Sequence, residues 1–117
     1  MPLTKQYTVD VDVTLNRQIG NQISFIIPDT NVYTVTATFK EGTNTFDLSS
    51  YTVELLLNNA PLTNVTVDDA VNGVVSVVFD DTSAFEDNGV YKVLLRLTDG
   101  AVVRHFNGFN FSTKTLP

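Results

Sequence analysis

The sequence contains no cysteine and no tryptophan, and it has a single histidine, His105. Without cysteine the chain has no disulfide framework, no thiolate metal site and no cysteine nucleophile. One histidine cannot build a histidine-rich metal site, and a catalytic base also needs a nucleophile and an orienting group beside it. We therefore interpret His105 as a surface side chain, outside any catalytic or metal site.

Basic residues are also scarce, with 7 Lys and Arg against 13 Asp and Glu, for a net charge of −6. Because phosphate binding needs clustered Lys and Arg, this balance argues against a nucleic-acid partner. No apolar run approaches the roughly 20 residues of a membrane helix, and residues 1–8 lack the apolar segment of a secretory signal. The sequence therefore predicts neither a nucleic-acid nor a membrane partner.

Motifs of catalysis and cofactor binding are missing as well, including glycine-rich phosphate loops and the G-x-S-x-G nucleophile motif. Three acidic pairs could supply oxygen ligands for calcium, but no run matches the EF-hand loop, so we interpret them as turn-forming and solvating carboxylates. The sequence thus predicts a protein that is not an enzyme, with no catalytic residue, no cofactor and no metal site. The three pairs are Asp68 with Asp69, Asp80 with Asp81, and Glu86 with Asp87.

The dominant positive signal is the alternation of apolar and polar residues, which is typical of half-buried β-strands. Gly and Asn turn formers separate the alternating runs, and Asn72-Gly73 suits a type I′ hairpin. We predict an all-β fold, an Ig-like two-sheet antiparallel β-sandwich, as one domain over residues 1–117 with about 1–6 and 113–117 loosely held. The expected strands cover residues 7–15, 33–39, 51–57, 65–67, 74–79, 91–97, and 101–106 with 109–111 as one strand broken near Gly108; 81–86 could form one helical turn.

A local motif supports the Ig-like topology. Asp87, Gly89 and Tyr91 fit the pattern Asp-x-Gly-x-Tyr, which resembles the tyrosine corner that opens the F strand of immunoglobulin-like domains. There the Tyr hydroxyl bonds back to the backbone just upstream. Val93 stands where antibody domains have a cysteine, so core packing has to replace the disulfide. The three residues are expected to have a structural role.

The 12 Phe and Tyr residues can serve a core or a binding surface. Aromatic rings carry a large apolar area, so we expect most of them between the two sheets, although Phe106, Phe109 and Phe111 could instead face a partner. Carbohydrate binding usually exposes aromatic rings in a shallow groove. A solvent-exposed pair among Tyr7, Tyr33 and Tyr51 would favour that alternative function, but their alternation with Thr favours burial.

Five segments follow one another in an order that resembles a known family. Their pattern is an early strand, D-T-N-V before a second strand, F-D-L-S-x-Y-x-V, G-x-Y-x-V-x-L-x-L-x-D, and a phenylalanine-rich closing strand. It resembles the N-terminal domain of the baseplate upper protein of siphophages that infect Gram-positive bacteria. The segments are residues 7–23, 28–39, 46–55, 89–99 and 109–111.

The resemblance implies a structural function. In that family the domain attaches a receptor-binding or adsorption module to the tail tip by docking on the distal tail protein or neighbouring baseplate proteins. It implies a location in the virion, with assembly in the host cytoplasm, and a trimer where a stem follows the domain. The alternative from another class is a carbohydrate-binding module that recognises host cell-wall polysaccharide. The first strand, residues 7–15, is our candidate edge for a partner strand.

Overall fold

The computed structural model describes residues 4–15, 17–19, 23–27, 32–79 and 89–115, and this part of the chain consists of strands and turns. No helix in the described ranges is long and apolar enough to cross a membrane. The expected helical turn at 81–86 lies outside the described residues. The strands are β1 (Thr4–Asp12), β2 (Arg17–Ile19), β3 (Ile23–Ile27), β4 (Val32–Glu41), β5 (Asn44–Thr45), β6 (Thr52–Leu57), β7 (Ala60–Pro61), β8 (Val65–Asp69), β9 (Val74–Phe79), β10 (Val90–Asp99) and β11 (Val102–Thr115).

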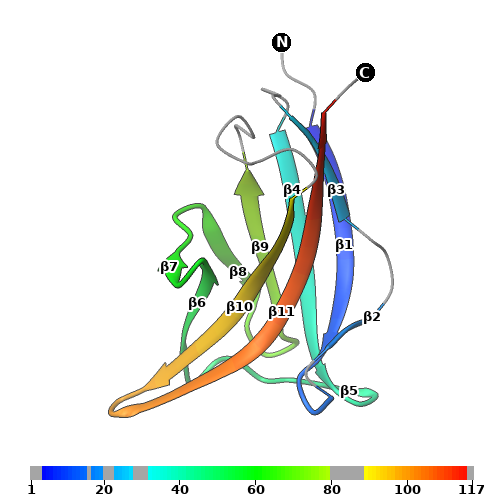
Figure 1. Cartoon of the computed structure of the whole chain (residues 1–117). Coiled ribbons are helices and arrows are strands. Elements are labelled where there is room, and N and C mark those ends of the chain that lie inside the picture. Colours follow the sequence, from blue (N-terminus) through cyan, green and yellow to red (C-terminus); the bar gives the residue numbers. More distant parts are fainter. Residues whose placement is uncertain (1–3, 16, 20–22, 28–31, 80–88, 116–117) are drawn as a thin grey trace.

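The strands form two sheets that pack face to face, which confirms the predicted sandwich (Figure 1). Sheet 1 has the order β2-β1-β4-β9-β8, with β5 beside β4, and sheet 2 has the order β3-β11-β10-β6-β7. The sheets are mixed, because β1 runs parallel to β4 and β3 runs parallel to β11. This differs from the expected antiparallel arrangement. The reason is the length of chain between the paired strands. A long connection separates β1 from β4 and β3 from β11, and such connections permit parallel pairing.

The strand order is compatible with an immunoglobulin-like topology. In that topology the B, E and D strands are neighbours in one sheet, and C, F and G are neighbours in the other. Here β4, β9 and β8 are adjacent in sheet 1, and β6, β10 and β11 are adjacent in sheet 2. Strands β2 and β3 were not expected from the sequence, and β3 adds an edge strand to sheet 2.

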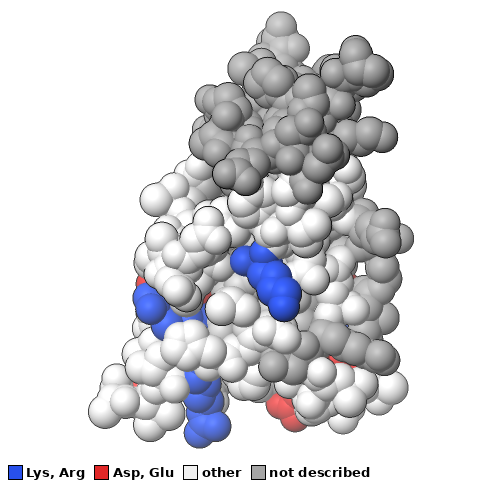
Figure 2. Space-filling view, viewed as in Figure 1, with Lys and Arg blue, Asp and Glu red and all other residues white. Residues whose placement is uncertain are grey.

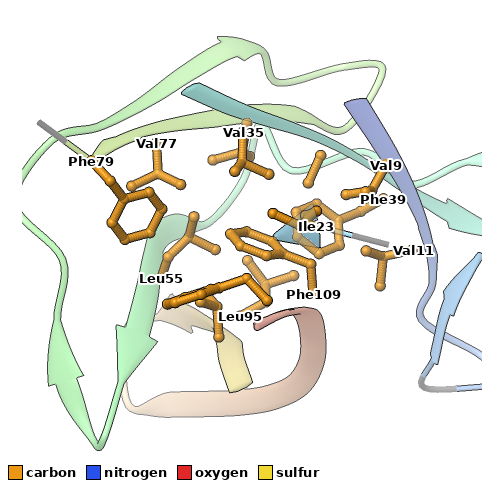
Figure 3. Packing of buried hydrophobic residues seen from close by; sticks show 14 of the residues in the cluster. Val9, Val11, Ile23, Val35, Phe39, Leu55, Val77, Phe79, Leu95 and Phe109 are labelled. Carbon is orange, nitrogen blue, oxygen red and sulfur yellow. The ribbon is translucent and has the colours of Figure 1, made fainter. Parts of the chain in front are cut away.

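Alternating side chains of both sheets meet in one hydrophobic core (Figure 3). Val9 and Val11 of β1 lie on the side of the core opposite Leu95 of β10 and Phe109 of β11. The ring of Phe25 packs at 4.6 Å from those of Tyr33 and Phe111, measured between centroids. Phe109 and Phe111 are buried and Phe106 is half-buried against the core. The core interpretation of this stripe is therefore confirmed.

The turn at Asn72-Gly73 lies where the sequence predicts one, but its geometry differs. Only Gly73 has a positive φ, of 73°, whereas a type I′ turn needs a positive φ at both residues. The connection spans residues 70–73, since Asp69 is paired with Val74. A Cβ at Gly73 would lie 2.6 Å from the carbonyl oxygen of Phe39, so this position has room for glycine alone. The type I′ pattern of φ occurs instead at Asn58 and Asn59, between β6 and β7.

The closing strand β11 is continuous and contains an irregularity at Gly108. The pairing with β10 shifts register between Lys92 and Leu94, which pair with Asn110 and Asn107. A Cβ at Gly108 would lie 2.4 Å from the carbonyl oxygen of Val93. The break expected near Gly108 is therefore a β-bulge within one strand.

The start of β1 and the end of β11 lie at the same end of the sandwich, and the β10–β11 hairpin turns at the other end (Figure 1). Strand β1 begins at Thr4 and β11 ends at Thr115. Residues 4–6 and 113–115, which we expected to be loosely held, are thus parts of strands, while 1–3 and 116–117 lie outside the described residues.

Candidate docking surfaces

The acidic residues of the described ranges do not gather into a metal site, since no group of three or more His, Cys, Asp or Glu there could hold an ion. Asp69 accepts hydrogen bonds from the backbone N–H of Asn72 at 3.3 Å and from its Nδ2 at 2.8 Å. The carboxylate of Asp69 therefore stabilises the β8–β9 turn. The residues Asp80, Asp81, Glu86 and Asp87 lie outside the described ranges.

Asp12, at the end of β1, is the buried carboxylate of the described chain. Its Oδ1 accepts hydrogen bonds from the Thr14 hydroxyl at 2.6 Å and the Thr14 N–H at 2.9 Å. The backbone N–H groups of Leu15, at 3.2 Å, and Gly42, at 3.5 Å, also point to it. The Thr14 hydroxyl and these amides lower the pKa of Asp12 against the opposing effect of burial. This residue joins two neighbouring turns and is a structural group.

One side of the sandwich presents an unpaired strand edge. Strand β1 pairs with β4 over its whole length, but β2 pairs only with Asp10, Val11 and Asp12. Among the described residues, no strand pairs with the other side of β1 over residues 4–9. The expected edge strand is thus open over its first part, and its backbone N–H and C=O groups there can pair with another chain.

Two hydrogen bonds connect sheet 1 and sheet 2 on the same side of the sandwich. The Tyr7 hydroxyl of β1 donates to the carbonyl oxygen of Ser24 in β3 at 2.6 Å. The backbone N–H of Asn110 in β11 donates to Oε1 of Gln18 in β2 at 2.8 Å. Each bond joins one sheet to the other, so the open edge of β1 is held at a fixed position relative to sheet 2.

The outer face of sheet 1 is rich in hydroxyl side chains. Thr8, Thr36, Ser76 and Thr66 lie opposite one another on four neighbouring strands. The charges on this face include the ion pair between Lys40 Nζ and Asp10 Oδ2, at 3.3 Å. The centre of this outer face therefore carries small hydroxyl side chains.

The outer face of sheet 2 carries several Lys and Arg side chains, which are visible in Figure 2. Arg96 of β10 forms an ion pair with Glu54 of β6, with Nη2 at 2.8 Å from Oε1. Lys92 and His105 are exposed, and His105 lies beside Arg96 in the strand register. An open hollow of about 280 Å³ lies at the bulge. It is lined by Gln18, Lys92, Val93, Leu94, Asn107, Gly108 and Asn110.

The residues of the expected tyrosine corner are described only in part. Tyr91 is half-buried near the start of β10, and its ring stacks on Phe111 with 5.2 Å between centroids. Gly89 donates its N–H to the Thr113 hydroxyl at 3.0 Å, and its carbonyl accepts from the Thr113 N–H at 2.9 Å. Asp87 lies outside the described residues, so the corner stays a prediction.

The aromatic rings that would favour sugar binding lie against the core. Tyr33 is fully buried, and Tyr7 and Tyr51 are half-buried and packed on the hydrophobic cluster. These three residues therefore do not form the solvent-exposed pair that a carbohydrate-binding groove would need.

Comparison with known families identifies the family to which these features belong. The model of the BppU N-terminal domain, the domain of the baseplate upper protein, matches residues 5–115. The chain belongs to this family. The resemblance found in the sequence is thereby confirmed, and this BppU N-terminal domain is a structural protein of the phage baseplate, located in the virion tail, where it contacts other tail or baseplate proteins.

A solved structure shares the fold of this BppU domain. It is the N-terminal domain of phage TP901-1 ORF48, which is 17% identical and superposes with a TM-score of 0.63. The match covers 98% of this chain and 100% of that one. At this identity the likeness concerns the fold alone. No curated protein matches the sequence.

Proposed function

We propose that this BppU N-terminal domain anchors a receptor-binding or adsorption module to the phage tail tip by docking on the distal tail protein. The observation that carries the proposal is the open edge of β1 over residues 4–9, beside two hydrogen bonds that hold it rigidly. A sheet edge can add a strand from a partner, and the main-chain hydrogen bonds then supply affinity.

The composition supports assembly of this kind. A chain without cysteine folds without disulfides, which suits assembly in the host bacterial cytoplasm. A net charge of −6 keeps the unassembled domain soluble and favours docking on a basic partner. Where a helical stem follows the domain, we expect a trimer.

The test is co-elution of the purified domain with the distal tail protein of the same phage, compared with binding to wall polysaccharide. Co-elution with the tail protein and no retention on the polysaccharide is the expected result. Retention on the polysaccharide without binding of the tail protein would reverse the assignment and favour the carbohydrate-binding alternative.

Proline variants test whether the edge of β1 makes the contact. Adjacent residues of a strand direct their backbone N–H groups to opposite sides of the strand. Proline has no backbone N–H. Of the two variants Lys5→Pro and Gln6→Pro, one therefore loses a hydrogen bond to β4, and the other loses an N–H donor at the open edge of β1. The variant that keeps the wild-type melting temperature is the edge variant. We expect it to bind the tail protein about fivefold more weakly, the effect of one hydrogen bond of about 1 kcal/mol. Unchanged binding would show that the contact lies elsewhere.

A further inference from the structure

The open hollow at the β-bulge is a surface feature that the proposed function does not use. It lies where β10 and β11 change register, and its volume is about 280 Å³. One water molecule takes about 30 Å³ in the liquid, so the hollow has room for a small polar group together with several waters. We call this feature, with the lining residues named above, the bulge hollow.

The bulge brings two asparagines to the same face of sheet 2. In a regular strand, residues three apart, such as Asn107 and Asn110, point to opposite faces. Here they pair with Leu94 and Lys92, which are two apart in β10 and therefore share a face. This is the outer face, because Val93 between them is buried in the core. The extra residue of the bulge thus places both amide side chains beside Lys92.

The backbone and one hydrogen bond fix the floor and one wall of the bulge hollow. Gly108 has no side chain between the two asparagines, and a Cβ there would lie 2.4 Å from the carbonyl oxygen of Val93. On the side of β2, the Oε1 atom of Gln18 accepts the hydrogen bond from the N–H of Asn110 at 2.8 Å. These parts are in position before any ligand arrives, which lowers the entropy cost of binding.

The bulge hollow is cationic. Lys92 is the one charged residue in its described lining, and this side chain has no carboxylate partner among the described residues. Glu54, on the same outer face, is already paired with Arg96. Three carboxamide side chains in the lining contribute N–H donors as well as carbonyl acceptors. A ligand group with a negative charge and oxygen acceptors therefore complements the hollow.

We propose that the bulge hollow binds a carboxylate side chain, Asp or Glu, of a neighbouring baseplate protein. Lys92 supplies the opposite charge, and the amides of Asn107 and Asn110 donate hydrogen bonds to the carboxylate oxygens. Hydrogen bonds to a charged group are stronger than those between neutral groups. No aromatic ring is in the described lining, which disfavours a carboxylate carried by a sugar. The hollow takes a side chain rather than a strand and lies outside the open edge of β1, so this inference goes beyond the proposed function.

A single carboxylate is expected to bind weakly on its own, because ion pairs at exposed sites contribute little free energy. In the assembled baseplate, other contacts between the same two proteins hold the carboxylate near the hollow and raise its effective concentration. The contact then favours a partner that presents an acidic residue at this position over one that presents a basic residue.

Amide NMR titration of the full 117-residue chain tests the proposal. The probe is N-acetyl-glutamate N-methylamide, which replaces chloride at a constant ionic strength of roughly 0.15 M so that screening does not change. We expect saturable shifts confined to the amides of residues 92–94 and 107–110. The dissociation constant should be about 10–100 mM, the range for one or two charge-assisted hydrogen bonds.

Two comparison probes define the chemistry of the ligand. N-acetyl-glutamine N-methylamide has the same shape without the charge, and it should cause no saturable shift. D-glucuronate carries the carboxylate on a sugar ring, and it should bind more weakly than the glutamate derivative. Equal shifts with the glutamine derivative, or no shift with the glutamate derivative, would overturn the proposal. Equal or tighter binding of glucuronate would overturn the assignment to a protein side chain and favour a wall polysaccharide.

Variants identify the residues that bind. Asn110→Asp places a carboxylate beside Lys92 at nearly unchanged size and should abolish binding, whereas Asn44→Asp makes the same change in β5 and should bind like the wild type. Lys92→Gln should weaken binding about fivefold, the upper range for an exposed ion pair. Arg104→Gln is its control at an exposed cation outside the hollow. All four chains should keep the wild-type melting curve, because these side chains are exposed.

Two results with folded variants would overturn the assignment of the hollow. One is wild-type affinity in Asn110→Asp or in Lys92→Gln. The other is an equal loss in Lys92→Gln and Arg104→Gln, which would show a general effect of net charge. Because the titration uses small molecules and the anchoring test uses the tail protein, failure of either proposal would leave the other intact.

Discussion

Asp12 connects two turns through one carboxylate oxygen, which accepts from Thr14, Leu15 and Gly42. The sequence offered no sign of this role, because Asp12 alternates with apolar residues like the outward-facing Asp10. The difference arises at the end of β1, where the chain turns and the carboxylate is buried. Alternation alone places Asp10 and Asp12 on the same face of the strand, and it does not distinguish the buried carboxylate of Asp12 from the partly exposed one of Asp10.

The pH dependence of stability should report on Asp12. The Thr14 hydroxyl and the nearby backbone amides hold the folded-state pKa of Asp12 below its ordinary value of 3.8. The contribution of Asp12 to stability is therefore present above that pH and is lost as the pH falls through the folded-state pKa. We expect Asp12→Asn to lower the urea midpoint at pH 7, and the difference from wild type to shrink below about pH 3.8. The measurement is urea unfolding from pH 7 to pH 2.

Asp10→Asn is the control for that series. Asp10 forms a partly exposed ion pair with Lys40, and such surface pairs contribute little to stability. A drop in midpoint for Asp10→Asn equal to that of Asp12→Asn would contradict the special role of the buried carboxylate.

The substitution Tyr91→Phe tests the predicted tyrosine corner. If its hydroxyl bonds to the backbone upstream, Tyr91→Phe should destabilise the domain by about 1 kcal/mol, the typical net value of one hydrogen bond. The ring remains stacked on Phe111, so packing is preserved. Tyr51→Phe is a matched control on another half-buried tyrosine, and we expect its urea midpoint to stay near the wild-type value. An unchanged midpoint in Tyr91→Phe would remove the corner.

At the scale of strands, the alternating runs predicted seven of the observed elements, because half-buried strands have a strict period of two. Strand β3 was missed because Ile23–Ile27 is a short, mostly apolar run, and periodicity cannot distinguish such a run from a buried helical segment. The parallel pairs β1–β4 and β3–β11 were missed for another reason. Partners distant along the chain are selected by the packing of the whole core, and no local pattern encodes them.

Of the candidate surfaces, the sequence predicted the edge at β1 from its early position and length. The exposure of Val102 and Val103 could not be predicted in this way, because two apolar β-branched residues in a strand are usually at least half-buried. They are exposed since the hairpin extends past the region that the other strands cover (Figure 1). Whether such residues are exposed depends on how far the β10–β11 hairpin extends beyond the strands of both sheets that would cover it.

Alanine substitutions at two turn glycines, Gly73 and Gly100, separate the cost of a positive φ from the cost of a steric clash. Gly73 and Gly100 both have a positive φ, of 73° and 57°. Alanine in this conformation costs roughly 1–2 kcal/mol. At Gly73 a Cβ would also meet two carbonyl oxygens at 2.6 and 2.7 Å, whereas at Gly100 nothing lies within 4 Å. We expect Gly73→Ala to lower the free energy of unfolding well beyond Gly100→Ala in urea titrations, and equal losses would rule out the collision.

At the scale of the whole molecule, the two sheets share one core, to which β1, β4 and β9 contribute from one side and β6, β10 and β11 from the other. Neither sheet can bury its apolar face without the other. We therefore expect a single cooperative unfolding transition. Urea curves followed by far-ultraviolet circular dichroism and by tyrosine fluorescence should have the same midpoint, and two separate midpoints would mean that the sheets unfold independently.

Strand β11 has consequences for how the domain bears mechanical tension. It is flanked by β10 on one side and, near Thr115, by β3 on the other. A pull on Thr115 along the strand loads both ladders in shear, so many hydrogen bonds share the force and have to break together. A terminal strand at a sheet edge, pulled sideways, would instead peel off one bond at a time. The arrangement makes this end of the domain a strong point of attachment.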